Sequence, residues 1–313
     1  MKTHKEIYLG TQKLATSFDE VSGTEVKIEG ETFYKIANYD AMRPFFMSIV
    51  SNSNHWMFLS STGGLTAGRK NSNFALFPYY TDDKITESSE TTGSKTVCLV
   101  TRSGQTSLWE PFSSKYEGVY NLSRNLYKNS YGNKVKFEEV NHDLGLTFSY
   151  EWNSSDKFGF VRKSALINNG SAAASVKFID GLQNLLPYGV EDALQNASSN
   201  LVDAYKKCEL EASVGLGLFS LSAIIVDKAE PSEALRSNVA WSLGRPNATK
   251  LLSSKQLNAF RKGEWPTQEV DIKAERGAYM ICDTVDLDAG ASEHWSILAD
   301  VNKGPVEVAD LMA

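Results

Sequence analysis

Four pairs of neighbouring acidic residues are the first side chains in this sequence that could perform acid–base chemistry. Hydrolysis of a glycosidic bond normally uses two carboxyl groups about 5–10 Å apart. The pairs are Asp82/Asp83, Glu138/Glu139, Glu191/Asp192 and Asp286/Asp288. The first and last pairs lie in turns, the second alternates across a predicted strand, and the third opens a predicted helix, where negative charge is favourable. We therefore expect solvent-exposed or capping roles and predict no catalytic residue.

The histidines and cysteines show no spacing that indicates a metal site or an activated nucleophile. The histidines are His4, His55, His142 and His294. They form no H-x-H or H-x-x-x-H pattern, and the chain has no G-x-S-x-G motif. Cys98, Cys208 and Cys282 are far apart in the sequence, without a C-x-x-C spacing. We expect free thiols in a reducing compartment, no metal and no cofactor.

The segment 60–80, "SSTGGLTAGRKNSNFALFPYY", partly matches a phosphate-binding loop. Such a loop needs a lysine, then a serine or threonine, and then a helix. Arg69 and Lys70 stand at those two positions, and the asparagines, proline and aromatics that follow disfavour a helix. The glycines instead predict a tight turn at Gly63-Gly64 and a bend or bulge at Gly68.

The same segment predicts a surface that contacts a sugar. Arg69, Tyr79 and Tyr80 are expected near a sheet edge, where aromatic faces cover C–H groups and a guanidinium donates to hydroxyls. Trp109 in "SLWEPFS" and Trp265 in "GEWPTQ" stand beside prolines in loop-like surroundings, where we expect exposure. We predict Arg69, Tyr79, Tyr80 and Trp109 as carbohydrate-contacting residues. The alternative for each is ordinary packing.

Composition restricts the classes of partner. The chain has 313 residues, a formal net charge of −6 and a pI near 5.4, so general binding to nucleic acid or to an anionic membrane is not expected. The first residues lack the apolar run of a secretory signal, and the longest apolar stretch, 214–226, is too short and interrupted to cross a bilayer. We expect a cytoplasmic protein.

Alternation of apolar and polar residues is the dominant structural pattern. In "LGLTFSYEW" five large apolar residues occupy alternate positions from Leu144 to Trp152, and "NKVKFEEVN" alternates just before it. The pair predicts an antiparallel hairpin with one solvated face. Similar runs recur along the chain, so we predict an all-β sandwich or barrel.

Helical spacing occurs in three places. Val190, Leu194, Ala197, Leu201 and Ala204 fall on one face of a predicted helix. A shorter helix is expected in "SSKQLNAFRKG", and Pro305 is a plausible first helical residue. We therefore divide the chain into a β domain, 1–302, and the start of a linker helix, 303–313, which leads to a downstream domain outside this sequence.

Several segments resemble the N-terminal region of cellobiose-phosphorylase-like proteins, glycoside hydrolase family 94 and its relatives. They are "HWMFLSSTGGLTAGRKNSNFALFPYY", "SLWEPFS", "FGFVRKSALINNGSAAASVKFIDGL" and "ERGAYMICDTVDLDAGASEHWSILADV". The resemblance implies a β-supersandwich of the galactose-mutarotase-like type, followed by a linker helix and an (α/α)6 catalytic domain. It also implies an oligo- or disaccharide ligand and a possible homodimer. The inserted helix near 190–204 departs from the family's pattern.

The resemblance leads to one preferred function and two alternatives. The preferred function is a non-catalytic N-terminal domain of a glycoside phosphorylase or hydrolase, which packs against the helical catalytic domain and shapes the substrate entrance. One alternative is a stand-alone aldose 1-epimerase, with His55, His142 or His294 as the acid and a glutamate as the base. His142 is expected to be exposed, whereas His55 and His294, each beside a tryptophan, are expected to be packed. The other alternative is a carbohydrate-binding module.

Overall fold

The fold is all-β, as expected, and every strand pair in the described chain is antiparallel. The computed structural model describes residues 6–15, 20–81, 83–223 and 235–313. The largest sheet has 11 strands, in the spatial order β19 (Asp271–Lys273), β15 (Lys206–Glu211), β16 (Leu216–Leu221), β17 (Ser237–Leu243), β21 (Ser292–Lys303), β13 (Gly159–Asn168), β12 (Leu146–Ser155), β11 (Val135–Asn141), β10 (Leu122–Asn129), β4 (Glu31–Ala37) and β3 (Ser22–Ile28).

Two smaller sheets and a short hairpin complete the strands. The five-stranded sheet has the order β18 (Thr249–Leu251), β20 (Gly277–Leu287), β14 (Ala174–Leu185), β8 (Gly93–Arg102) and β9 (Gln105–Trp109). The three-stranded sheet contains β5 (Phe46–Ile49), β6 (His55–Ser60) and β7 (Leu65–Arg69), and an N-terminal hairpin pairs β1 (Tyr8–Leu9) with β2 (Gln12–Lys13).

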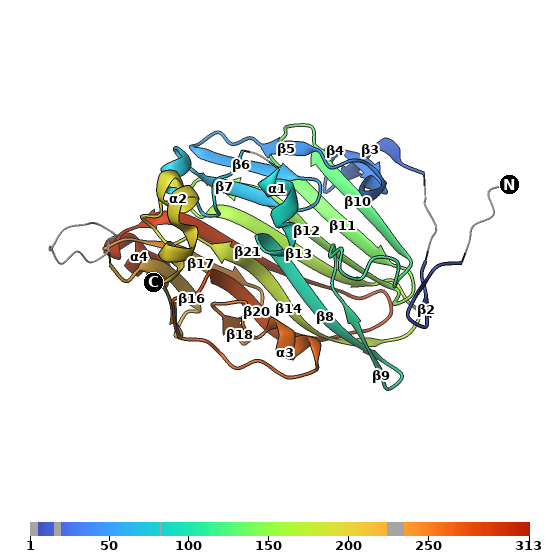
Figure 1. Ribbon diagram of the computed structural model, residues 1–313. Helices are drawn as coiled ribbons and strands as arrows, with labels where there is room; N and C mark the ends of the chain where they lie inside the picture. Colours follow the sequence, from blue (N-terminus) through green and yellow to red (C-terminus); the bar gives the residue numbers. More distant parts are fainter. Residues whose placement is uncertain (1–5, 16–19, 82, 224–234) are drawn as a thin grey trace.

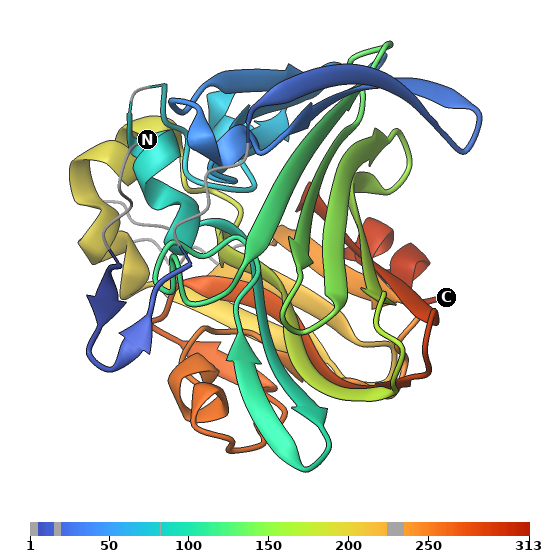
Figure 2. The same ribbon diagram turned by 90° about the vertical axis from the view of Figure 1, so that its right-hand side faces the viewer.

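The core lies between the large sheet and the two smaller sheets. Alternate residues of β12 (Phe148, Tyr150 and Trp152) are buried together with Phe178 of β14 and Leu59 of β6. Figure 1 shows the three-stranded sheet above the five-stranded sheet, with α1 (Lys84–Glu87) between β6 and β8. In Figure 2 the curved strands β10–β13 lie on one side, and α1 lies on the other with α2 (Asp192–Asp203).

The predicted hairpin is present as β11 and β12. The register pairs Phe137 with Tyr150, and their stacked rings have centroids 5.0 Å apart. The opposite face is polar but less solvated than expected, since Thr147 and Ser149 are buried. Short side chains in the middle of a wide sheet are shielded by longer neighbours, here Glu138 opposite Ser149.

The buried face of α2 differs from the prediction. Leu201, expected on the apolar face, is 52% exposed, whereas Val202 is fully buried. Ala197 and Ala204 of the predicted face are exposed too, and the backbone leaves helical geometry at Ser198, with a φ of −145°. This break rotates the second half of the helix, so a 3.6-residue period drawn across it selects the wrong residue.

The other predicted helices are present. They are α3 (Leu257–Arg261) and α4 (Pro305–Met312), which begins at the expected proline. The short 3-10 turns are η1 (Tyr39–Ala41), η2 (Ser72–Phe74) and η3 (Ser88–Glu90). Within the described ranges, every helix is too short or too polar to cross a membrane. The three cysteines are free and buried, and burial raises the pKa of Cys208 and of Cys282 to about 12.

The glycines of the segment 60–80 form the predicted tight turn, but the bend or bulge predicted at Gly68 is absent, because Gly68 pairs with Trp56 in an unbroken β6–β7 register. Gly63 has a φ of +91° in the turn that joins β6 to β7. A Cβ on Gly64 would lie 1.8 Å from the carbonyl oxygen of Ile85, so only glycine allows α1 to approach this turn. A Cβ on Gly68 would lie 2.4 Å from the carbonyl oxygen of Phe74. The segment that follows is the 3-10 turn η2 rather than the helix of a phosphate-binding loop.

Candidate functional site

A surface hollow of about 330 Å³ brings the two predicted tyrosines together with residues of α2. Its lining residues are Tyr79, Tyr80, Thr81, Lys84, Asp192 and Asn196. Tyr79 and Tyr80 are half-buried, and Asn196 is exposed. We call this region the tyrosine hollow. Its volume lies at the lower end of the range for small-molecule sites, about 300–1,000 Å³.

Packing on both sides fixes the geometry of the tyrosine hollow. The ring of Tyr79 meets the indole of Trp56 edge to face, with centroids 5.4 Å apart. The ammonium of Lys84 lies 5.0 Å from the centroid of the Tyr80 ring. The Trp56 contact packs the Tyr79 ring against the three-stranded sheet, and Lys84 lies over the Tyr80 ring from the exposed side.

Hydrogen bonds attach the start of α2 to the turn that follows β7. Ser72 donates from its Oγ to Asp192 Oδ2 at 2.8 Å, and the Asp192 backbone N–H donates to Asn73 Oδ1 at 3.4 Å. The Asp192 carboxylate also accepts from the backbone N–H of Ala193 at 2.6 Å. The two halves of the hollow, more than 100 residues apart in the sequence, are therefore joined directly.

The side chains in the tyrosine hollow suit recognition better than acid–base catalysis. Phenol rings offer flat faces to C–H groups, while the carboxylate, amide and hydroxyl groups exchange hydrogen bonds with ligand hydroxyls. The described lining contains one carboxylate and no imidazole, whereas sugar hydrolysis uses two carboxyl groups.

Arg69, the third predicted residue, lies in a separate hollow of about 150 Å³. Its Nη1 forms an ion pair with Asp300 Oδ2 at 2.9 Å, and its Nε donates to Asn54 Oδ1 at 2.7 Å. The segment 70–74 separates this hollow from the tyrosine hollow. Lys70 and Phe74 line the Arg69 side, and Ser72 contacts Asp192 on the other.

The predicted exposure of Trp109 is wrong. Trp109 ends β9 opposite Cys98 of β8, and only 1% of its surface is exposed. Its indole Nε1 donates to Glu139 Oε1 at 2.7 Å, so the side chain faces the large sheet. Glu139 is itself fully buried and paired with Arg124, which corrects the expected solvated role of that carboxylate. Trp265 is 46% exposed, as expected.

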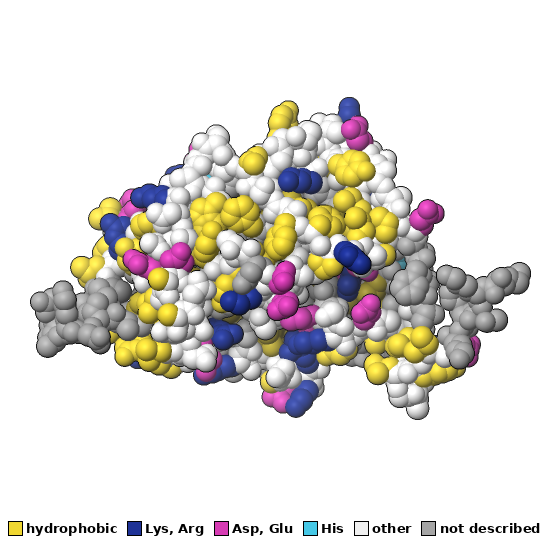
Figure 3. Space-filling view, turned by 45° about the horizontal axis from the view of Figure 1, so that its top comes forward, with side chains coloured by type: hydrophobic (Ala, Val, Ile, Leu, Met, Phe, Trp, Pro, Cys, Tyr) yellow, Lys and Arg dark blue, Asp and Glu magenta, His cyan; other side chains and the backbone are white. Residues whose placement is uncertain are grey.

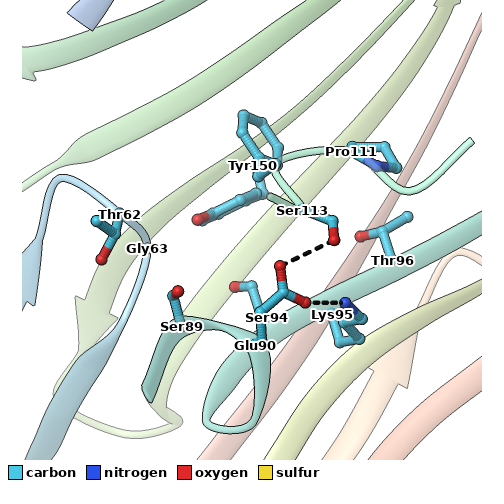
Figure 4. Close-up of a pocket in the computed structure, with 11 residues that line it drawn as sticks. Thr62, Gly63, Ser89, Glu90, Ser94, Lys95, Thr96, Pro111, Ser113 and Tyr150 are labelled. Carbon is cyan, nitrogen blue, oxygen red and sulfur yellow. Dashed lines mark hydrogen bonds and ion pairs between the residues drawn. The ribbon is translucent and has the colours of Figure 1, made fainter. Parts of the chain in front are cut away.

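A small polar pocket at the junction of the three sheets is a second candidate (Figure 4). Glu90 accepts from Lys95 Nζ at 2.7 Å and from Ser113 Oγ at 2.8 Å, and Tyr150 closes the far side. Burial opposes ionisation of Glu90, but the hydrogen bond and charge of Lys95 outweigh it and lower the pKa of Glu90 to about 2. The pocket holds about 20 Å³, room for about one water molecule, so a sugar ring does not fit.

A buried charge network that the sequence analysis missed lies behind this pocket. Asp180 accepts two hydrogen bonds from Arg162, at 2.7 and 2.9 Å, and one each from Thr96, Ser164 and Trp295. Arg162 and Asp180 have no exposed surface. The alternation in "GFVRKSALIN" was the available signal, since Arg162 occupies the same face as buried neighbours two residues away.

The histidines and the remaining acidic pairs do not form a catalytic arrangement in the described chain. His142 is exposed, as expected, but His294 is also exposed, which contradicts its predicted packing. His55 is partly buried, and its ring packs edge to face on Phe160 at 5.0 Å. Each of the three imidazoles is hydrogen-bonded to a serine hydroxyl. Asp286 and Asp288 are exposed, whereas His4 and Asp82 lie outside the described residues.

Metal-binding groups and sequence relatives give no further assignment. Within the described ranges, no three or more histidine, cysteine or acidic side chains gather to hold a metal ion. No family model matches the chain. No curated protein matches it.

Comparison with solved structures gives matches of low similarity. A polysaccharide lyase matches with a TM-score of 0.44 and 10% identity over 85% of this chain, and this chain covers 33% of that lyase. A galactose mutarotase-like protein from Lactobacillus casei ATCC 334 matches with a TM-score of 0.43 and 11% identity over 82% of this chain and 100% of its own. A candidate aldose 1-epimerase from Escherichia coli K12 matches with a TM-score of 0.43 and 10% identity. The match covers 83% of this chain and 99% of that protein. At this level the likeness carries no argument about activity, and none of these three is a cellobiose phosphorylase.

Proposed function

We propose that this chain is a non-catalytic, carbohydrate-binding β-sandwich domain of a larger carbohydrate-active enzyme. The observation that carries the proposal is the tyrosine hollow, in which two half-buried phenol rings converge with a carboxylate and an amide. Rigid aromatic rings beside hydrogen-bonding groups are suited to sugar rings, which present C–H faces and hydroxyl edges. Tyr79 and Tyr80 remain proposed ligand contacts, whereas Trp109 is buried in the core and is no longer one of them.

The absence of a catalytic role is part of this proposal. An aldose 1-epimerase needs an acid and a base that converge on one sugar, whereas His142 and His294 are exposed and His55 packs on Phe160, and each is bonded to a serine. The polar pocket of Glu90 is too small for a ring. An assay of mutarotation on glucose and galactose tests this point: catalysis that is lost on replacing one histidine would contradict the proposal.

A second surface supports a role in packing against the catalytic domain of the same polypeptide. A groove of about 400 Å³ between β3–β4 and β5 is lined by apolar side chains that include Tyr34, Ile36, Phe46 and Met47. Figure 3 shows hydrophobic side chains in several patches on this face, and Tyr34 and Phe46 are each more than half exposed. Apolar patches of this kind mark interaction sites more often than plain surface. Sedimentation of the purified chain tests the alternative occupant of this groove. A dimer would show that a second copy of the chain covers it.

Calorimetric titration with neutral and acidic oligosaccharides tests the binding proposal. The variant Tyr79→Ala/Tyr80→Ala is expected to lose binding, since stacked aromatic contacts are lost with the rings. Tyr131→Ala is the matched control, because Tyr131 is 74% exposed in the turn between β10 and β11. Equal affinity of the double variant and the wild-type chain would overturn the proposal, as would a failure of every oligosaccharide to bind.

A further inference from the structure

The hollow around Arg69 carries more positive charge than its own carboxylates neutralise. Three of its lining residues are cations (Arg69, Lys70 and Lys303), and the amides of Asn54 and Asn302 lie beside them. At about 150 Å³ it accepts a compact group rather than a whole oligosaccharide. We call this region the basic hollow.

Asp300 is the buried anchor of the basic hollow. Its carboxylate has no exposed surface and receives Arg69 Nη1 at 2.9 Å and Lys303 Nζ at 2.7 Å. One negative charge therefore holds two positive charges in place. Lys70 adds another positive charge at the exposed rim, where its ammonium lies 5.3 Å from the centroid of the Phe74 ring.

The neighbouring groups keep the balance positive. Arg236 donates from Nη1 to Asn302 Oδ1 at 2.9 Å, which brings a fourth cation to the same place. Asp156, whose backbone carbonyl accepts from Arg69 Nη2 at 3.5 Å, is the second acidic residue at this hollow. Four cations and two acidic residues among the described side chains leave an excess of positive charge, which favours an anionic ligand.

The basic hollow and the tyrosine hollow share one wall. The segment 70–74 separates them: Lys70 and Phe74 line the first, while Ser72 and Asn73 are bonded to Asp192 of the second. Trp56 is also common to both sides, since its indole donates to the carbonyl of Asn71 and packs on Tyr79. A chain-like ligand seated in one hollow therefore passes over this wall toward the other.

We propose that the ligand is an acidic oligosaccharide, with one sugar ring in the tyrosine hollow and an anionic substituent of a neighbouring unit in the basic hollow. This inference rests on the proposed carbohydrate-binding function and names its substrate class. The substituent is a carboxylate or a sulfate ester, because both accept several charge-assisted hydrogen bonds from ammonium and guanidinium groups. Screening by salt weakens such contacts, so affinity falls as ionic strength rises.

Calorimetric titration of the full chain with four probes tests the inference: tetragalacturonate, a heparin-derived tetrasaccharide, cellotetraose and inorganic sulfate. The variant Lys70→Gln/Lys303→Gln removes two charges but leaves Arg69 on Asp300, so the buried carboxylate keeps a partner. We expect it to bind the better acidic tetrasaccharide about tenfold more weakly than wild type, the effect of about 1.4 kcal/mol. Lys262→Gln, at an exposed position after α3, is the matched control and leaves affinity unchanged.

The outcomes separate this inference from the function on which it rests. If cellotetraose binds as tightly as the acidic probes, the anionic groups of the ligand add nothing to the affinity. The inference then fails, while the proposed carbohydrate binding is unaffected. If sulfate alone competes as strongly as either acidic tetrasaccharide, the basic hollow is an isolated anion site and the inference also fails. An equal loss in Lys262→Gln would show a long-range effect of net charge and would overturn it too. Binding of no saccharide would defeat both proposals. Tetragalacturonate carries carboxylates only and the heparin fragment carries both groups, so tighter binding of the heparin fragment shows that sulfate contributes, and equal or tighter binding of tetragalacturonate shows that a carboxylate suffices.

Discussion

Replacing Arg162 by methionine is expected to destabilise the domain more than any single loss of a neutral partner of Asp180. The substitution removes a guanidinium that makes two hydrogen bonds to a fully buried carboxylate. Breaking a buried ion pair by removing one partner costs about 3–5 kcal/mol of stability. Thr96, Ser164 and Trp295 still donate to Asp180, so we expect a value at the lower end, about 3 kcal/mol.

Two comparison variants make this estimate specific. Thr96→Val removes one neutral donor at 2.6 Å and is expected to cost about 1–2 kcal/mol, because the carboxylate keeps its cation. Arg162→Lys keeps the charge but not the two-pronged geometry, so it should fall between the other two. Equilibrium unfolding in urea measures the free energy of unfolding of all three variants. The values are compared where the slope of that free energy against urea concentration is the same. A loss below about 1 kcal/mol in Arg162→Met, or a larger loss in Thr96→Val, would refute the reasoning.

Three further predictions concern other parts of the core. Trp109→Phe keeps the ring but removes the donor to Glu139, and we expect a loss of about 1–3 kcal/mol in urea unfolding. Gly64→Ala places a methyl 1.8 Å from the Ile85 carbonyl oxygen and should cost about 1–3 kcal/mol by overpacking, seen as a lower thermal midpoint. The pKa of Glu90 is about 2 in the folded state, below its ordinary value of 4.5. Glu90 therefore stabilises the fold above about pH 4.5, and this contribution is lost as the pH falls toward 2. Urea midpoints of wild type and Glu90→Gln should therefore converge as the solution is acidified.

The first two predictions have control variants elsewhere in the chain, and the third has an outcome that would contradict it. Trp265→Phe changes a half-exposed indole and should leave stability nearly unchanged. Gly290→Ala meets no atom within 4 Å but has a φ of +77°, which Gly64 does not share, so it measures backbone strain without the clash expected at Gly64. A constant difference between wild type and Glu90→Gln from neutral to acid pH would contradict the low pKa of Glu90.

Strand alternation predicted the parts of the fold that depend on local periodicity. The β11–β12 hairpin, the burial of Trp152 and the start of α4 at Pro305 all follow from residues close together in the sequence. The predicted face of α2 was wrong from Ala197 onward, since Ala197 is exposed before the break at Ser198, and Leu201 and Ala204 are exposed after it. Trp109 was wrong because its burial depends on Glu139, which lies on another strand 30 residues away.

The candidate site was predictable only in part for the same reason. Tyr79 and Tyr80 stand out as adjacent aromatics after a glycine-rich segment. Asp192 and Asn196 carry no local signal, since their place in the hollow depends on the contact of α2 with Ser72. Arg69 was predicted for its chemistry, but its orientation is set by Asp300, 231 residues later.

Two separate smaller sheets, rather than one, pack on the large sheet, and this has a consequence for how the domain can change over evolution. The three-stranded and five-stranded sheets pack on one common sheet but share no strand ladder in the described chain. The connection between β7 and β8, residues 70–92, crosses from one ladder to the other and touches the first through an isolated bridge between Ala75 and Gly68. Leu76, Phe77 and Ile85 of this connection are buried, so insertions leave both sheets and the core intact only at its exposed part, near Thr81 and Asp83. Because this connection also carries Tyr79 and Tyr80, descendants of one ancestral chain can acquire different binding preferences while retaining the same scaffold.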